Sequence, residues 1–216
     1  MRMGPDSYLA LASTSTFEVR EKASRFIASA FPIAGEVSFK EQLEAITRNH
    51  HTARHICYGW VVGLRGERFR AFDAGEPAGS AGKPILRQLQ GAGLTFSAIV
   101  VVRYFGGTLL GKAGLAHAFA DAAKGALANN TIAEHRVMAL LSATCTYAQV
   151  EALRTDVLQH AGKVLGAEYA QQCTMQVALP QGDAAALIAR WQRQGVQFMP
   201  AAQAGEASDP PAMPFT

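Results

Sequence analysis

Residues 106–112 read Gly-Gly-Thr-Leu-Leu-Gly-Lys and carry the most suggestive chemical motif of the sequence. They match G-x-x-x-x-G-K, which is all but the last position of a phosphate-binding P-loop. Ala113 stands at that position, where a nucleotide triphosphatase needs Ser or Thr to bind Mg²⁺. Three interpretations stay open: a weak triphosphatase, an anion site made by helix N-terminal N–H groups and Lys112, or a tight turn that needs glycine for its backbone angles.

A second candidate site combines His55 and Cys57 with Asp73 and Glu76. Residues two apart on a strand share a face, so His55 and Cys57 lie side by side. Side chains on one face point outward in parallel, which does not suit a Cys/His nucleophile pair. A structural role is favoured, in which the carboxylates accept hydrogen bonds from loop N–H groups and from Arg103 or Arg70. A hydrolase acting at the Asp73/Glu76/His55 corner stays as the alternative.

Alternating and helical patterns place both candidate sites in an α/β region spanning 16–133. Strands are predicted at 17–19, 24–31, 55–64 and 98–102, and helices after the Ser38–Glu41 capping-box pattern, from about Pro84, and at about 115–128. The glycine-rich stretch 73–84 and the glycine motif 106–112 fall in loops that precede helices. Residues 1–15 are predicted to be a flexible leader.

The region 134–200 has a different pattern. Strands are predicted at 137–145, 164–169 and 173–179 and at Val196 with Phe198, and helices along the Val150–Ala161 stripe and around Leu187 and Trp191, ended by Gly195. The order βαββαβ predicts a ferredoxin-like domain. No titratable cluster lies on it, so docking or binding is its expected role. The proline-containing stretch 201–216 is predicted to be a disordered tail.

Composition excludes several classes of protein. Three cysteines without a C-x-x-C pair favour neither a disulfide framework nor a zinc cluster, so no metal or cofactor is expected. No apolar run is long enough for a signal peptide or a membrane span, so we expect a cytoplasmic protein without membrane contact. Residues 1–133 carry 15 Lys/Arg against 10 Asp/Glu, whereas 134–216 carry 5 against 7. The positive charge therefore belongs to the region that holds both candidate sites.

Three segments in the same order and spacing resemble the IMPACT/YigZ family. They are Ala53-Arg54-His55-Ile56-Cys57, Asp73-Ala74-Gly75-Glu76-Pro77-Ala78-Gly79-Ser80-Ala81-Gly82 with Pro84-Ile85-Leu86, and Val100-Val101-Val102-Arg103-Tyr104-Phe105-Gly106-Gly107 with Leu110-Gly111. The resemblance covers about residues 16–130, and the βαββαβ unit is similar to the small C-terminal domain of bacterial members.

This resemblance implies an α+β fold. The first domain would be like domain IV of elongation factor G, with a left-handed βαβ crossover, and the ferredoxin-like second would be like domain V. It implies contact with RNA, the ribosome or a translation regulator, since eukaryotic relatives are associated with control of a kinase that phosphorylates an initiation factor. It carries no catalytic residue, and it assigns motif positions to His55, Asp73, Gly75, Glu76, Pro77, Gly79, Gly82, Arg103, Tyr104, Phe105, Gly106, Gly107, Gly111 and Gly114.

The chain departs from the family pattern in two motifs. Ala74 replaces the second Asp of Asp-Asp-Gly-Glu-Pro. Where the last motif often reads Gly-Gly-Leu-x-Arg-Ala-Tyr, the chain has Ala-Gly-Leu-Ala-His-Ala-Phe at 113–119, with His117 in place of the Arg. A histidine is mostly neutral at pH 7, so we expect only moderate binding of polyanions. The sequence predicts a non-enzymatic, translation-associated binding protein with an anion or nucleic-acid site at Arg103, Gly106, Gly107, Gly111, Lys112 and His117. The alternative is a hydrolase or weak triphosphatase at the two sites above.

Overall fold

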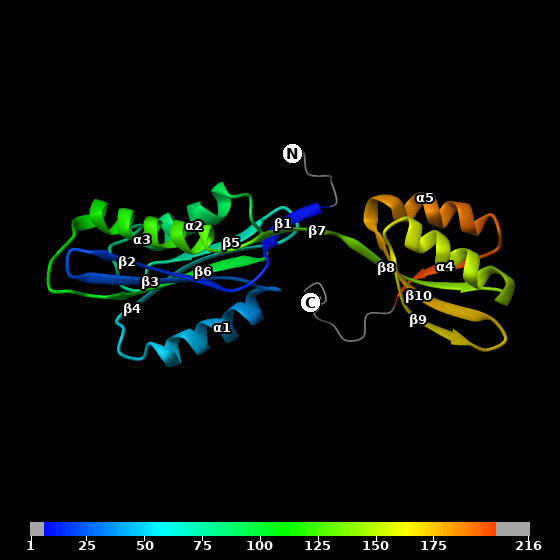
Figure 1. Ribbon diagram of the computed structural model, residues 1–216, viewed down its shortest axis with the longest axis horizontal. Coiled ribbons are helices and arrows are strands. Elements are labelled where there is room, and N and C mark those ends of the chain that lie inside the picture. Colours follow the sequence, from blue (N-terminus) through cyan, green and yellow to red (C-terminus); the bar gives the residue numbers. More distant parts are fainter. Residues whose placement is uncertain (1–6, 202–216) are drawn as a thin grey trace. The chain divides into compact units, whose positions relative to one another are not determined.

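The computed structural model describes residues 7–201, and its contacts divide them into two compact units (Figure 1). Tyr8–His135 forms the N-terminal unit, and the described part of the C-terminal unit is residue 7 with residues 136–201. Within 7–201, no helix is long and apolar enough to cross a membrane. The tail predicted at 201–216 lies outside the described residues except for Ala201, as does the start of the predicted leader.

The N-terminal unit is built on a five-stranded antiparallel sheet with the strand order β2-β3-β6-β4-β5, and β1 pairs separately with β7. The strands are β1 Ser7–Leu11, β2 Ser15–Glu21, β3 Ser24–Pro32, β4 His55–Val62, β5 Arg68–Phe72, β6 Ser97–Tyr104 and β7 Ile132–Arg136. The helices are α1 Glu36–Asn49, α2 Gly82–Gly91 and α3 Gly111–Ala128.

Helices cover both faces of this sheet, so the unit has three layers (Figure 1). On β6, Ile99 and Val101 pack with α2 and α3, whereas Ala98 and Val100 belong to the core that contains Phe39 of α1. Because strand side chains alternate between faces, a strand buried on both sides must be apolar throughout. This explains the continuous apolar run at the centre of β6.

Two crossover connections link the strands of this sheet. β3 and β4 run parallel on either side of β6 and are joined through α1, while β5 and β6 run parallel on either side of β4 and are joined through α2. A half-turn about the sheet normal superimposes the two strand paths, but α1 and α2 lie on opposite faces. The crossovers therefore have opposite hands. One of them is left-handed, which is rare among parallel crossovers and agrees with the fold that the resemblance implied.

Four local predictions for this unit need correction. Residues 7–11, assigned to the flexible leader, form β1, because Ala10 and Leu11 are buried. Strand β5 was missed, since it has only five residues, nearly all exposed, and its Arg-Phe-Arg-Ala alternation is short. Helix α1 begins before Ser38, whose hydroxyl accepts from the N–H groups of Ala34 and Gly35 and donates to the Gly35 carbonyl. Helix α3 begins at Gly111 rather than near 115.

The C-terminal unit has the βαββαβ order that the sequence predicts. Its sheet runs β11-β8-β10-β9 with all pairs antiparallel, and its core lies between the sheet and two helices. A short 3₁₀ turn, Tyr147–Gln149, precedes the first helix. The elements are β8 Met138–Cys145, α4 Val150–Gln159, β9 Lys163–Tyr169, β10 Cys173–Pro180, α5 Gln181–Gln192 and β11 Gln197–Pro200. This order of strands is the ferredoxin-like arrangement.

Close packing of α2 on β4 gives the first prediction. A Cβ added at Gly59 would lie 2.9 Å from the backbone of Leu86, so Gly59→Ala must push α2 away from the sheet. We expect a loss of about 1–3 kcal/mol in the free energy of unfolding, as for other overpacked cores. The measurement is urea unfolding followed by the fluorescence of Trp60 in a Trp191→Phe background.

Gly91→Ala in α2 is the matched control, because no atom lies within 4 Å of its added Cβ. Alanine is the better helix former, so this variant should be as stable as the parent or more stable by ~0.5–1 kcal/mol. Equal stability of Gly59→Ala and the parent would contradict the packing argument.

Candidate functional site

The loops that carry the sequence motifs meet at one end of the N-terminal sheet. Strand pairing places Glu21 opposite Ser24, Arg25 opposite Tyr104, and His55 opposite Arg103, so the β2–β3 turn, the end of β6 and the start of β4 are adjacent. The end of β5 reaches the same edge, because Phe72 pairs with Tyr58. We call this edge the loop end: the turn at 22–23, residues 50–54, and the loops 73–81 and 105–110. Helices α2 and α3 both begin there.

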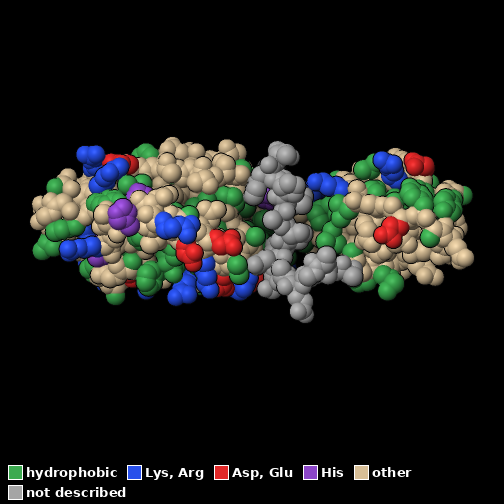
Figure 2. Space-filling model, turned by 90° about the horizontal axis from the view of Figure 1, so that it is seen from below, with side chains coloured by type: hydrophobic (Ala, Val, Ile, Leu, Met, Phe, Trp, Pro, Cys, Tyr) green, Lys and Arg blue, Asp and Glu red, His purple; other side chains and the backbone are tan. Residues whose placement is uncertain are grey.

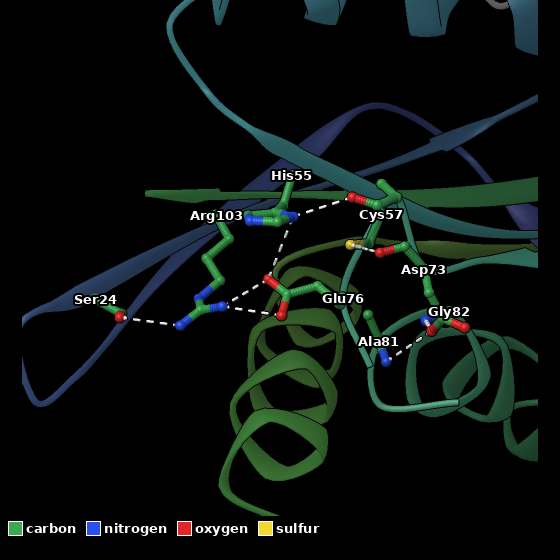
Figure 3. A network of polar contacts seen from close by, with 9 residues as sticks. Ser24, His55, Cys57, Asp73, Glu76, Ala81, Gly82 and Arg103 are labelled. Atoms are coloured by element: carbon green, nitrogen blue, oxygen red, sulfur yellow. Dashed lines mark hydrogen bonds and ion pairs between the residues drawn. The ribbon is translucent and has the colours of Figure 1, made fainter. Parts of the chain in front are cut away.

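A buried ion pair lies at the centre of the loop end (Figure 3). Arg103 Nη1 donates to both carboxylate oxygens of Glu76, at 2.7 and 2.9 Å, and the two side chains are 6% and 2% exposed. The Arg103 Nη2 group lies 3.4 Å from the Ser24 hydroxyl, which also accepts from the Gly106 N–H. Strand β6, the 73–81 loop and the β2–β3 turn are therefore tied to one guanidinium group.

Aromatic rings enclose the same guanidinium. Its carbon lies 5.5 Å from the ring centre of Phe26, the cross-strand neighbour of Arg103, and 5.4 Å from that of Phe105. Both distances are within the range of cation–π contact. A side chain so enclosed cannot reach a ligand phosphate. This corrects the prediction that Arg103 is one of the anion-contacting side chains, and it confirms the predicted contact between Glu76 and Arg103.

Asp73 caps helix α2 from outside the helix. Its Oδ1 accepts from the N–H groups of Ala81 and Gly82 at 3.0 and 2.9 Å, and its Oδ2 accepts from Gly79 at 2.9 Å. Burial raises the pKa of the Asp73 carboxyl, but these three hydrogen bonds and the nearby Lys83 ammonium outweigh it and hold the pKa below its usual value. The predicted acceptance of loop N–H groups is confirmed for Asp73, and its carboxylate is fully engaged.

His55 and Cys57 share the face of β4 that packs toward α2 and α3, as their spacing predicts. His55 Nδ1 lies 3.0 Å from the Ala74 carbonyl oxygen, which can only accept, so Nδ1 carries the proton. The Cys57 thiol donates to the Asp73 carbonyl at 3.1 Å and is fully buried. Burial, with the Glu76 and Asp73 carboxylates, raises the Cys57 pKa well above its usual value. Such a thiol is a poor nucleophile.

The remaining residues of the 73–82 motif shape the loop. Ala74 has a φ of 48°, in the left-handed region that Asp adopts more readily than Ala, so the departure at this position strains the backbone. A Cβ at Gly82 would lie 2.4 Å from the Phe72 nitrogen, which fixes glycine where α2 meets β5. Gly75 and Gly79 have positive φ, and Pro77 is exposed on the loop.

The glycine motif 106–112 forms an exposed loop from β6 into α3, which confirms the predicted strand–loop–helix context. Gly106 packs against the β2–β3 turn so closely that a Cβ would lie 1.9 Å from the Ala23 carbonyl oxygen. Lys22 Nζ donates to the Leu109 carbonyl at 3.4 Å. Leu110, the N-cap residue of α3, supplies no side-chain hydrogen bond to the helix. The exposed Lys112 lies in the first turn.

The other predicted positions fall in different places. Tyr104 points to the α1 side, where its hydroxyl is 3.0 Å from His50 Nδ1, whereas Phe105 is half-exposed beside Arg103. His117 is almost fully exposed and lies nearly two turns into α3. It is therefore not part of the helix start. Its Nε2 atom is 3.5 Å from Oδ2 of Asp121. Gly107 and Gly111 have positive φ, and Gly114 packs on Leu110.

Several exposed cations lie at the loop end, and the α1 face carries exposed cations as well, among them Lys40 and Arg48. Lys22, Arg54, Lys83 and Lys112 are exposed there, whereas the carboxylates of Asp73 and Glu76 are engaged in the contacts above. On the α1 face, basic and acidic side chains are interspersed (Figure 2). Across residues 7–201, no group of three or more His, Cys, Asp or Glu side chains is placed to hold a metal ion.

The C-terminal unit has a separate open groove of about 530 Å³ between its helices. Asp156 of α4 accepts from Trp191 Nε1 at 2.6 Å and from Arg190, so it links α4 to α5. The groove combines both charges and is lined by Glu151, Ala152, Thr155, Asp156, Gln159, Arg190, Trp191 and Gln194. Within it, Asp156 binds both Arg190 and Trp191.

Comparisons with known proteins agree with this architecture. An Impact N-terminal domain model matches residues 22–127, and a model of a domain of unknown function, DUF1949, matches residues 144–190. The chain is 34% identical over 187 residues to the IMPACT family member YigZ of Escherichia coli, covering 86% of this chain and 92% of that protein. The chain belongs to the IMPACT family.

Other relatives extend this assignment. The IMPACT family member YvyE of Bacillus subtilis is 31% identical over 141 residues, which is 65% of each chain. A crystal structure titled only as that of a hypothetical protein shares 32% identity and a TM-score of 0.68, covering 92% of this chain and 98% of the other. The structural similarity of this IMPACT protein to a solved structure therefore extends over both units.

Three contributors to the site were not found from the sequence: Ser24, Phe26 and Lys22. Each reaches the loop end only through the pairing of β3 with β6 and β2, and register between distant strands has no local signal. The proximity of Arg103 and His55 depends in the same way on β4 pairing with β6. The family motifs identified the loops correctly, but they did not indicate which of the motif side chains are buried.

Removing the Glu76 charge tests the central ion pair. Glu76→Gln leaves the Arg103 guanidinium buried without a counter-charge, so we expect a loss of about 3–5 kcal/mol in the free energy of unfolding. The double variant Glu76→Leu/Arg103→Met should recover much of this loss, because apolar replacement of a buried pair costs little. Chemical denaturation of both variants measures the difference. A double variant as unstable as Glu76→Gln would contradict the explanation.

Asp73 predicts a pH dependence. Its folded-state pKa is lowered, so its contribution to stability is complete above its unfolded pKa of about 3.9 and is lost as the pH falls through the folded value. Asp73→Asn removes the charge and replaces one accepting oxygen with an NH₂ group, so it should lose about 1.5–3 kcal/mol at pH 7. The difference from the parent should shrink below pH ~4. A constant difference from pH 7 to pH 2 in denaturant titrations would rule out the charge as the cause.

Proposed function

We propose that this IMPACT protein is a non-enzymatic, translation-associated protein that contacts RNA, free or in the ribosome, through the loop end of its N-terminal unit. The observation that carries this proposal is the contrast between the two helices that begin there. The N-terminus of α2 holds the Asp73 carboxylate, whereas no side chain within residues 7–201 accepts from the first N–H groups of α3, which has Lys112 in its first turn.

The α2 terminus supports an anion-binding role for the α3 terminus. The first N–H groups of a helix have no partner within the helix, and the helix dipole favours negative charge there. At α2 the Asp73 carboxylate meets this requirement through hydrogen bonds of 2.9–3.0 Å. At α3 a phosphate oxygen from a ligand could take the same place, with Lys112 in the first turn and Lys22 in contact with the loop before it.

The charge at the loop end sets the expected strength of binding. Only a few exposed cations lie there, since Arg103 is neutralised by Glu76 and Arg25 pairs with Glu18. Binding to phosphate groups should therefore be moderate and should weaken with salt in proportion to the few contacts made, because each contact releases counterions from the nucleic acid.

The hydrolase and triphosphatase alternatives gain no support from the geometry. Cys57 is buried with a raised pKa, and Asp73 and Glu76 are fully engaged in hydrogen bonds or ion pairing. Ala113 leaves a P-loop without the hydroxyl that would bind Mg²⁺. What the 106–112 loop keeps is its backbone and one lysine, which suit binding rather than turnover.

The salt dependence of RNA binding tests this proposal. In fluorescence-anisotropy titrations of labelled RNA, the affinity of the parent should fall with salt, and Lys112→Ala should reduce the slope of log K against log salt by about 1. Lys40→Ala is the matched control, since Lys40 is exposed on α1 and away from the loop end. The control should leave the slope unchanged.

Two outcomes would contradict the proposal: no binding at low salt, or binding that does not depend on salt. Co-sedimentation with ribosomes before and after RNase treatment separates RNA from protein partners. If sedimentation survives RNase and still depends on Lys112, the loop end recognises an acidic protein surface instead of RNA. Turnover of ATP or GTP that Lys112→Ala abolishes would favour the enzyme.

A further inference from the structure

Three aromatic rings and one guanidinium contact one another in series, from the core of the N-terminal unit to its surface. The ring centres of Phe119 and Phe26 are 5.1 Å apart in an edge-to-face contact, and the Arg103 guanidinium lies 5.5 Å from Phe26 and 5.4 Å from Phe105. Phe119 and Phe26 are fully buried, and Arg103 is nearly so. Phe105, at the outer end, is 51% exposed.

The outermost ring is backed by fixed groups. Arg103 behind it is anchored by Glu76, and the next residue, Gly106, donates its N–H to Ser24 and packs on the Ala23 carbonyl. Single exposed apolar side chains are common and mean little by themselves. This one is different because a buried, charge-neutralised platform supports one face of the ring, which leaves its other side available to a partner.

Cations lie along the loop that begins with this ring. Lys22 reaches the Leu109 carbonyl, and Lys112 follows the same loop into α3. A preformed aromatic surface beside positive charge suits a nucleobase with its adjoining phosphates, since every base has a face that can stack. In a duplex these faces are hidden between neighbouring base pairs, so only an unpaired nucleotide fits.

We infer that Phe105 is a stacking platform for an unpaired base of single-stranded RNA, whose adjoining phosphates lie against Lys22, Lys112 and the start of α3. This inference rests on the proposed RNA-binding function and deepens it by naming the form of RNA recognised. Phe105 supplies the preference for unpaired bases, whereas the lysines supply affinity that is independent of sequence.

The test compares an unstructured single strand of about 12 nucleotides with a duplex of the same length in anisotropy titrations at low salt. The parent should bind the single strand more tightly. Phe105→Leu keeps apolar cover over Arg103 but has no ring, and it should weaken single-strand binding by about 5- to 100-fold while leaving the weaker duplex binding unchanged. Phe105→Trp should bind the single strand at least as well as the parent.

Phe69→Leu is the matched control, because Phe69 is also about half-exposed but lies near the start of β5, at the opposite end of the sheet. It should leave both affinities unchanged, and circular dichroism should show all variants folded. Equal affinity of Phe105→Leu and the parent for the single strand, with salt-dependent binding kept, overturns the stacking role alone. A parent that binds neither RNA overturns the proposed function itself.

Discussion

The Arg103–Glu76 pair holds together segments that are far apart in the sequence and that all meet at the loop end. The pair joins the end of β6 to the 73–81 loop, and Ser24 extends this connection to the β2–β3 turn. A buried ion pair adds little net stability compared with an apolar pair, because both charges lose their water. Its role here is to position the loops, because they are all held by contacts to one buried guanidinium group.

Because of these contacts, the residues whose types suggest catalysis differ from the residues that are accessible to a ligand. Asp73, Glu76 and His55 have the types expected of a catalytic corner, yet each is engaged with a neighbouring N–H, guanidinium or carbonyl group. The same contacts leave the 105–112 loop with its glycines, a supported aromatic ring and exposed lysines. The polar groups most prominent in the sequence thus build the scaffold, and less prominent ones form the accessible surface.

Local patterns predicted what depends on local physics. Alternation put His55 and Cys57 on one face of β4, and the strand and helix order of the C-terminal unit was correct throughout. The sequence could not show that β6 lies between β3 and β4, and so it could not show that Arg103 is buried between Phe26 and Glu76. Strands β1, β5 and β7 were missed because each has only five residues, and β1 and β7 pair with each other, across more than 100 residues of sequence.

The position of β6 in the sheet also bears on how the chain folds as it is made. β2 with β3 and β4 with β5 are neighbours in sequence and in the sheet, but the strand that joins these two hairpins comes last, at 97–104. Until it is synthesised, β3 and β4 each have an unpaired edge, the kind of edge that aggregates readily. Closure of the sheet needs contacts across many residues and is intrinsically slow. The apolar strand β6 completes the sheet, and until it is made the nascent chain keeps unpaired strand edges that favour aggregation.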